Sequence, residues 1–125
     1  MKSLNKLYWL KQEIEQIQGE IKELTMLGGS SLNGMPSGNK VSSPVERFIE
    51  RKERLIERLQ AKLDEFVKER ERTEDFIETI DDIEVRMIAR KRFIEHKGWQ
   101  VIGDEMYMDR NTASRKIKRY MERRK

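Results

Sequence analysis

The segment WQVIGDEMYMDRNTASRKIKRY, residues 99–120, carries side chains that can read DNA bases beside others that can hold phosphates. Arginine can form paired hydrogen bonds to guanine and asparagine to adenine, while hydroxyls and lysine contact bases or phosphates. The candidate DNA-binding residues are Gln100, Arg110, Asn111, Thr112, Ser114, Arg115, Lys118 and Arg119.

The expected roles of these residues follow from their position, because base contacts belong to the N-terminal part of a recognition helix. Base reading is therefore assigned chiefly to Arg110, Asn111, Ser114 and Arg115. Further along the helix, Lys118 and Arg119, followed by Arg123 and Arg124, are assigned to phosphates, where salt should weaken their contribution. Gln100 precedes this helix and is a candidate for a contact to the phosphate backbone.

Positive charge gathers at the same end of the chain. Residues 110–125 hold eight basic residues against Glu122 alone, whereas the whole chain of 125 residues has a net charge of +4. Such asymmetry indicates an anionic partner for the C-terminal end, with nucleic acid the first candidate. The alternative is that these charges belong to a solvated, frayed tail.

The elements that must position these residues begin with a predicted break near residues 77–80. Thr79-Ile80-Asp81-Asp82 resembles a fresh N-cap with an acid at the third helical position. A helix from Ile80 should run to Lys97-Gly98, because glycine adopts the left-handed conformation that commonly ends helices.

Two further helices are predicted after this one. Trp99, Ile102 and Met106 have the spacing of a helix of about two turns. Asp109 can then cap a third helix, about 110–124, whose inner face carries apolar residues at helical spacing: Ala113, Ile117, Tyr120 and Met121. This layout is typical of a helix-turn-helix, in which the last helix enters the major groove. A three-helix bundle that contacts another protein is the alternative.

The N-terminal part of the chain predicts a long helical arm. Its first helix has apolar residues at alternating spacings of three and four: Leu7, Leu10, Ile14, Ile17, Ile21 and Leu24. This heptad pattern favours packing along another helix. The helix should stop at Gly28-Gly29, and residues 28–43, rich in Gly, Ser, Asn and Pro, should form a flexible loop.

A second arm helix should begin at Ser43-Pro44-Val45-Glu46, which combines an N-cap serine, a first-turn proline and a glutamate in a capping box. It should continue for roughly 30 residues, or about 45 Å, and the loop allows an antiparallel hairpin. Its apolar stripe is wider than one partner helix needs, which favours a homodimer through the arm. Alternatively, the arm packs only on its own headpiece.

The run RFIEHKGWQVIGDEMYMDRNTASRKIKRY resembles the fourth conserved region of bacterial sigma factors. The positions that carry the resemblance are Arg92-Phe93, Gly98, Trp99, Ile102-Gly103, Asp109 and Thr112. With the arm, the whole chain is similar to small phage-encoded regulators of the RinA/ArpU type, which activate late or packaging genes. The resemblance implies sequence-specific DNA binding and a role in transcription activation. RNA polymerase is a further candidate partner of the basic C-terminal end.

Two positions depart from the pattern of the sigma region. Gly103 stands where alanine is more usual, and Tyr107 stands where the turn normally has glycine. The geometry of the turn is therefore expected to differ from that of the family.

Catalysis is not expected. The chain has no cysteine and only one histidine, His96, and no set of nucleophile, base and orienting residue can be assembled. Neighbouring acids such as Asp104-Glu105 point about 100° apart on a helix, so they do not converge on a metal. We expect no enzyme, no metal site and no cofactor.

The absence of cysteine suits a reducing compartment, and the longest apolar runs are too short to span a membrane. The expected location is therefore the cytoplasm of a bacterial host cell.

The sequence thus predicts an all-α protein with two parts. Residues 1–78 should form a long antiparallel helical hairpin, and residues 79–125 a three-helix headpiece containing the helix-turn-helix. The favoured function is a dimeric regulator of phage late or packaging genes that binds specific double-stranded DNA. The alternatives are a DNA-packaging adaptor resembling a small terminase subunit, or a coiled-coil module that binds protein.

Overall fold

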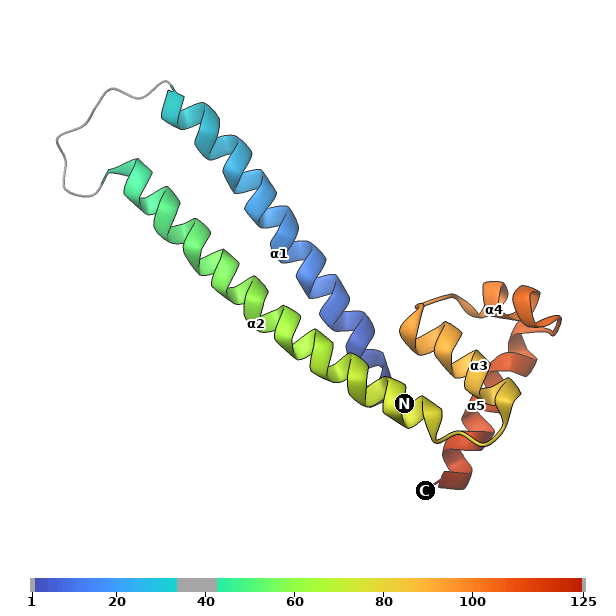
Figure 1. Cartoon of the computed structure of the whole chain (residues 1–125). Helices are drawn as coiled ribbons and strands as arrows, with labels where there is room; N and C mark the ends of the chain where they lie inside the picture. Colours follow the sequence, from blue (N-terminus) through green and yellow to red (C-terminus); the bar gives the residue numbers. More distant parts are fainter. Residues whose placement is uncertain (1, 34–42, 125) are drawn as a thin grey trace. The chain divides into compact units, whose positions relative to one another are not determined.

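The computed structural model describes residues 2–33 and 43–124 (Figure 1). Every regular element in these ranges is helical and none is a strand, which confirms the all-α prediction. The elements are α1 (Lys2–Asn33), α2 (Pro44–Glu78), α3 (Ile83–Ala89), the π-helix η1 (Arg90–Ile94), α4 (Trp99–Met106) and α5 (Arg110–Arg124).

The chain divides into two compact units, and each of the long helices α1 and α2 contributes to both. The arm unit is Leu10–Glu65, and the head unit is Met1–Trp9 together with Phe66–Lys125. One hydrophobic cluster in the head unit explains why the chain divides at these positions. It joins Leu7 of α1 and Ile77 of α2 to residues of the following helices, with Phe66 packed against it.

The head unit has a fully buried core. Six of its large side chains are at most 2% exposed, and all are aliphatic: Leu7, Ile77, Ile80, Ile88, Ile102 and Ile117. Ala113 of α5 is also completely buried. Burial of one such side chain contributes roughly 1.5–3 kcal/mol, so this core fixes how α3, α4 and α5 pack within the unit.

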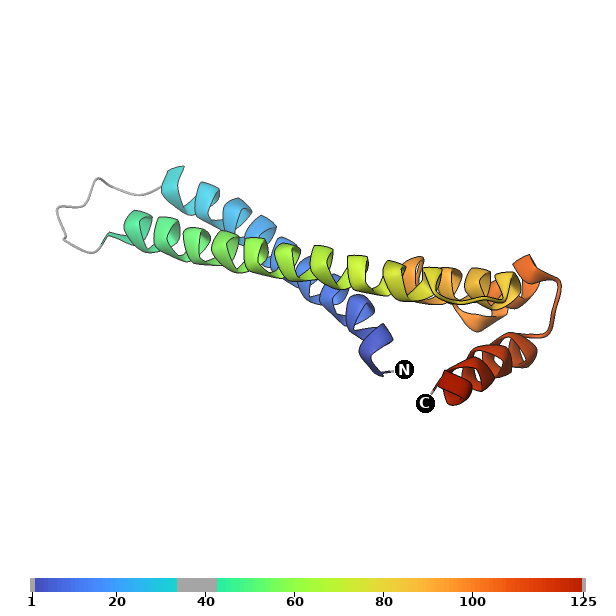
Figure 2. The same cartoon turned by 60° about the horizontal axis from the view of Figure 1, so that its bottom comes forward.

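In the arm unit, the predicted heptad of α1 is the buried face. Leu10, Ile14 and Ile17 are buried, as is Leu55 of α2, whereas Ile21 and Leu24 further along the heptad are half-buried. An ion pair of 3.1 Å between Lys62 Nζ and Glu13 also joins the two helices, which lie alongside each other in both views (Figures 1 and 2).

The predicted start of α2 is confirmed. Pro44 is its first residue, and the amide of Glu46 donates to Ser43 Oγ over 3.1 Å. The amide of Arg47 donates to the Ser43 carbonyl over 3.2 Å, so serine satisfies two amides of the first turn.

The predicted end of α1 at Gly28-Gly29 is wrong, because the helix continues to Asn33. Glycine in a helix costs only about 1 kcal/mol relative to alanine and does not block its path, whereas proline would. Pro36 comes only after the observed end. Within the predicted loop 28–43, residues 28–33 are therefore helical, and residues 34–42 lie outside the described residues.

The break after α2 occurs where the sequence predicts it, but the cap of the next helix is Asp82 rather than Thr79. The Thr79 hydroxyl donates to the Phe76 carbonyl at 2.6 Å, within the last turn of α2. The Thr79 hydroxyl is therefore hydrogen-bonded to α2 and not to the first turn of α3. Asp82 Oδ1 instead accepts from the amides of Glu84 and Val85, at 2.9 and 3.3 Å.

The predicted continuous helix from Ile80 to Gly98 is also corrected. α3 begins at Ile83, its last turn widens into η1, and the chain reverses at His96, which has a φ of 58°. The amide of Lys97 donates a hydrogen bond to the Lys91 carbonyl over 3.0 Å, and this bond closes the turn. Gly98 has an extended backbone and acts as the N-cap of α4, so histidine rather than glycine takes the left-handed position.

Candidate nucleic-acid interface

The turn between α4 and α5 is built around Gly103 and Tyr107, the two positions that depart from the sigma pattern. Tyr107 is left-handed, with φ 57° and ψ 44°, and its amide donates to the Gly103 carbonyl, as does that of Met108. A Cβ at Gly103 would lie 2.7 Å from the Met108 carbonyl oxygen and 3.1 Å from the Arg110 nitrogen. Glycine at 103 therefore allows a close turn in which a tyrosine, 97% exposed, supplies the left-handed residue.

The predicted cap fixes the start of α5. Asp109 Oδ2 accepts from the amide of Asn111 at 2.9 Å, and the Asp109 carbonyl accepts from that of Ala113 at 3.1 Å. Burial of Ala113 and Ile117 sets the rotation of the helix about its axis. The opposite side of α5 therefore faces solvent.

The predicted DNA-binding residues of α5 lie on or beside that side. Five are exposed: Arg110, Asn111, Arg115, Lys118 and Arg119. Thr112 and Ser114 are half-buried at its margin. Gln100 is exposed in the first turn of α4, where its amide donates to Asp104 at 3.2 Å. The candidates on α5 therefore share one helix, whereas Gln100 belongs to another and has an intrahelical partner.

The positive side chains of α5 fall into two groups. Lys116 pairs with Glu84 of α3, and the Arg124 guanidinium donates to Thr79 Oγ1 at 2.7 Å and to the Tyr120 hydroxyl at 2.9 Å. Arg124 also lies 5.0 Å from the centre of the Phe76 ring. These two cations join α5 to α3 and to residues 76–79 of the head unit, and the phosphate contact expected of Arg124 stays a prediction.

The second group has no carboxylate partner in the described part of the chain. It comprises Arg110, Arg115, Lys118, Arg119 and Arg123, all of them exposed. Cations that the fold leaves unpaired along one helix raise the local positive potential and attract anions.

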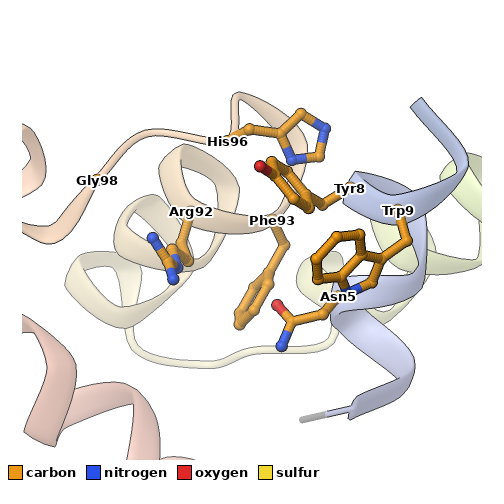
Figure 3. A pocket seen from close by; sticks show the side chains of 7 residues that line it. All are labelled: Asn5, Tyr8, Trp9, Arg92, Phe93, His96 and Gly98. Carbon is orange, nitrogen blue, oxygen red and sulfur yellow. The ribbon is translucent and has the colours of Figure 1, made fainter. Parts of the chain in front are cut away.

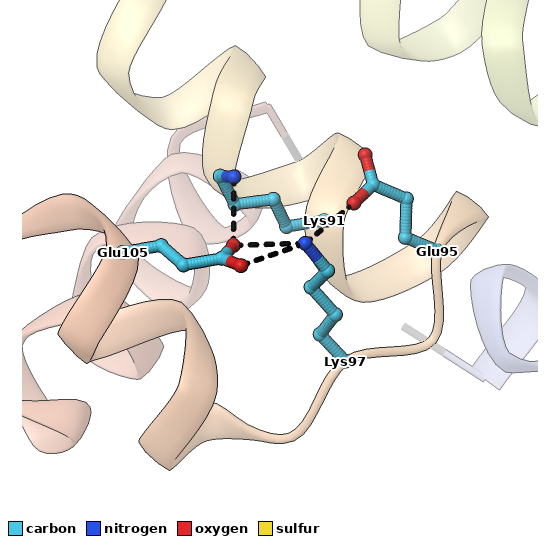
Figure 4. A network of polar contacts seen from close by, with 4 residues as sticks. All are labelled: Lys91, Glu95, Lys97 and Glu105. Atoms are coloured by element: carbon cyan, nitrogen blue, oxygen red, sulfur yellow. Dashed lines mark hydrogen bonds and ion pairs between the residues drawn. The ribbon is translucent and has the colours of Figure 1, made fainter.

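Glu105 of α4 anchors that helix to the preceding segment (Figure 4). It accepts from Lys91 at 2.8 Å and from Lys97 at 2.9 Å, and Lys97 also pairs with Glu95 at 3.0 Å. The hydrogen bond from Lys91, followed by that from Lys97, lowers the pKa of Glu105. The hydrogen bond to Glu105, followed by that to Glu95, raises the pKa of Lys97.

Sequence reasoning missed this network. Asp104 accepts from Gln100, while Glu105 faces Lys91 and Lys97, so the two acids have different partners. The anchoring role of Arg124 was also missed. Its partner Thr79 is 45 positions away in sequence, and no local pattern signals such a contact.

Comparison of the chain with protein-family models, curated proteins and solved structures found no match. Among the described residues, every helix is too short or too polar to cross a membrane.

Proposed function

We propose that the chain is a sequence-specific double-stranded DNA-binding protein and that α3, α4 and α5 form a helix-turn-helix headpiece. In this proposal α5 is the recognition helix in the major groove, and α4 crosses the phosphate backbone. The resemblance to the fourth sigma region and to RinA/ArpU-type proteins supports a regulator of phage late or packaging genes.

The observation that carries the proposal is the division of cations on α5. Lys116 and Arg124 bind other parts of the head unit, whereas the exposed cations near the start and middle of α5 have no described carboxylate partner. The packing of α5 within the head unit does not require the four charges at Arg110, Arg115, Lys118 and Arg119. Phosphates and guanine edges are suitable partners for them.

The order of residues along α5 supports separate roles. Arg110, Asn111 and Arg115 lie toward its N-terminal end, where a recognition helix meets base edges. Lys118 and Arg119 lie one turn or more beyond, where they would hold phosphates. Gln100 can contact a phosphate only by giving up or sharing its hydrogen bond to Asp104.

Self-association through the arm is the second part of the proposal. Within the arm unit, α2 leaves four aliphatic side chains exposed at spacings of four and seven: Val45, Ile49, Ile56 and Leu63. This stripe is separate from the face that carries Leu55, and a second copy would cover it. An antiparallel α1–α2 hairpin in each copy and a two-fold dimer would place two α5 helices on half-sites about one DNA turn, or a multiple, apart.

The dimer is tested by sedimentation of the full chain with Leu63→Glu, a charge placed in the stripe. We expect at least about a tenfold weaker association, because a carboxylate would be desolvated at an apolar interface. Asp64→Glu, a conservative change at the neighbouring exposed position, is the control and should associate normally. Unchanged association of Leu63→Glu would exclude the stripe as the interface.

DNA binding is tested by the salt dependence of affinity for mixed-sequence duplexes. Each phosphate contact contributes about 0.9 to the slope of log affinity against log salt, so Lys118→Ala/Arg119→Ala should lower that slope by about 2. The control Arg54→Ala/Arg58→Ala removes the same charge from exposed positions of α2 and should leave the slope nearly unchanged. Equal effects of both double variants would show that only net charge matters and would contradict the assignment to α5.

A further inference from the structure

The head unit contains a cavity of about 390 Å³ that the proposed DNA contacts do not use (Figure 3). Its volume falls within the range of about 300–1,000 Å³ that is usual for small-molecule sites. The main residues that line it come from α1, from η1 and from the turn that follows: Asn5, Tyr8, Trp9, Arg92, Phe93 and His96.

Aromatic rings form much of the cavity wall. The Tyr8 ring centre lies 5.1 Å from that of Trp9 and 5.6 Å from that of His96, in edge-to-face arrangements. Phe93 is buried, but Trp9 is 63% exposed and Tyr8 is 39% exposed. Two large rings thus remain accessible beside a cavity, where a flat ligand could stack on one ring and contact the other edge-on.

The backbone around the cavity is irregular at two successive points. Arg92 and Phe93 lie in the π-helix η1, and His96 is one of two described non-glycine residues with a positive φ. A π-helical turn is frequent at functional sites, and a left-handed non-glycine residue costs about 1–3 kcal/mol. Both features place side chains on this cavity rather than on the DNA-binding side of α5.

The Arg92 guanidinium is held in a fixed position. It donates to the Lys97 carbonyl at 3.1 Å and stacks 4.8 Å from the centre of the Trp99 ring. Arginine has five N–H donors, and only one has a described acceptor here. The nearby Glu95 carboxylate pairs with Lys97 at 3.0 Å, so its charge is already compensated.

We propose that this cavity binds a small planar aromatic carboxylate. Its ring would stack on the face of Trp9 and meet Tyr8 edge-on, because the Trp9 and Tyr8 rings are inclined at 79° to each other. Its carboxylate would accept hydrogen bonds from Arg92 and from the Asn5 amide. In Figure 3 the Tyr8 hydroxyl and the Asn5 amide are turned toward the side on which Arg92 lies. Because Arg92 also stacks on Trp99, the first residue of α4, the ligand would act on the helix that precedes α5.

The test uses the full chain without DNA and follows the indole N–H signals of Trp9 and Trp99 by nuclear magnetic resonance. Indole-3-acetate is the probe, and indole-3-acetamide and tryptamine are neutral and cationic controls of similar shape. We expect a saturable shift of the Trp9 signal with indole-3-acetate and about tenfold weaker binding of the amide, because a charge-assisted hydrogen bond is lost. Binding that does not distinguish the three probes, or no saturable shift, would overturn the proposal.

A charge placed at the rim gives a sharper test. Asn5→Asp should reverse the preference, so that tryptamine binds and indole-3-acetate does not. Gln18→Glu adds the same charge at another exposed position of α1 and should leave the preference unchanged. If the two variants behave alike, the carboxylate does not bind beside Asn5 and the proposal fails.

A second copy of the chain is the competing occupant. If the Trp9 signal shifts with protein concentration in the absence of probe, and Trp9→Ala abolishes that shift, the cavity is a protein interface and the ligand proposal is wrong. Because both readouts are made without DNA, these outcomes do not bear on the role of α5.

Discussion

The two compact units bury their apolar residues to very different extents. In the head unit, Ile88, Ile102 and Ala113 are completely buried, and the core continues into α2 through Ile77. In the arm unit, complete or near-complete burial is confined to one face of each helix, while Ile49 and Leu63 of α2 remain exposed. Both units are helical, so secondary structure does not account for the difference.

The difference lies in the core and not in the number of exposed apolar residues. The head unit also exposes Ile83, Met87 and Val101, but its inward-facing residues form one fully buried cluster. On α2 of the arm unit, exposed aliphatic residues instead follow one another along a single stripe. We therefore expect mutations in the head to change folding stability and those on the arm stripe to change association.

The largest expected effect comes from Ile102→Ala in α4. Removal of a completely buried isoleucine should reduce the free energy of unfolding by about 3 kcal/mol, through lost burial and a remaining cavity. Ile56→Ala on the exposed stripe should change it by less than about 0.5 kcal/mol. Urea unfolding, followed by circular dichroism at a protein concentration low enough to prevent association, measures both. Similar losses would remove the contrast between the units.

The glycines of the two units should respond in opposite directions to alanine. Gly103→Ala should destabilise by about 1–3 kcal/mol, because its Cβ would meet backbone atoms of the turn that cannot move away easily. Gly19→Ala in α1 should stabilise by up to about 1 kcal/mol, since nothing lies within 4 Å and alanine favours a helix. The same unfolding measurement compares them, and a stabilising Gly103→Ala would contradict the described turn.

A smaller gain is expected from Tyr107→Gly. Tyrosine in the left-handed region costs roughly 1–2 kcal/mol, and this side chain is almost entirely exposed, so its loss removes little packing. Glycine should raise the free energy of unfolding by about 1 kcal/mol after allowance for its greater freedom in the unfolded chain. Tyr107→Ala is the control, because alanine removes the ring but keeps the strain. If Tyr107→Ala raises the free energy of unfolding by the same amount, the destabilisation comes from the tyrosine ring and not from the left-handed backbone.

The smallest effect should be the pH dependence that Glu105 contributes. Its pKa is lowered by Lys91 and then Lys97, so its contribution is present above the ordinary pKa of glutamate and is lost as pH falls through the lower folded-state value. The melting temperature of Glu105→Gln should therefore fall less than that of the original chain between neutral pH and about pH 3. Glu105 is exposed, so the difference should be small. If the melting temperatures of Glu105→Gln and the original chain fall in parallel across this pH range, Glu105 does not contribute through the described network.

The pH dependence that Lys97 contributes to stability has the opposite sign. Its pKa is raised, so its contribution is present below the ordinary pKa of lysine and is lost only as pH rises through the higher folded-state value. It should not contribute to the change in acid, which isolates Glu105 as the source of that change.

The sequence predicts those parts of the fold that depend on local patterns. The start of α2 at Pro44, the length of α4 and the cap of α5 at Asp109 all follow from a few neighbouring residues. The rotation of α5 was also predictable, because Ala113 and Ile117 have helical spacing.

The errors arise where another interaction outweighs the local preference. Gly98 looked like the left-handed residue, but the π-helix shifted the reversal to His96. Thr79 looked like a cap, but its hydroxyl bonds back to α2 and accepts from Arg124. The cavity beside Trp9 depends on residues more than 80 positions apart, and no local pattern brings Asn5 near Arg92.

We propose that the outer face of α5 reads DNA sequence. The most direct test of this proposal is selection from random-sequence duplexes by the full chain at near-physiological salt, with Arg110→Ala/Arg115→Ala and the control Arg54→Ala/Arg58→Ala alongside. We expect a paired motif that the control retains and the α5 variant loses. No enriched motif, or one that the α5 variant retains, would contradict it.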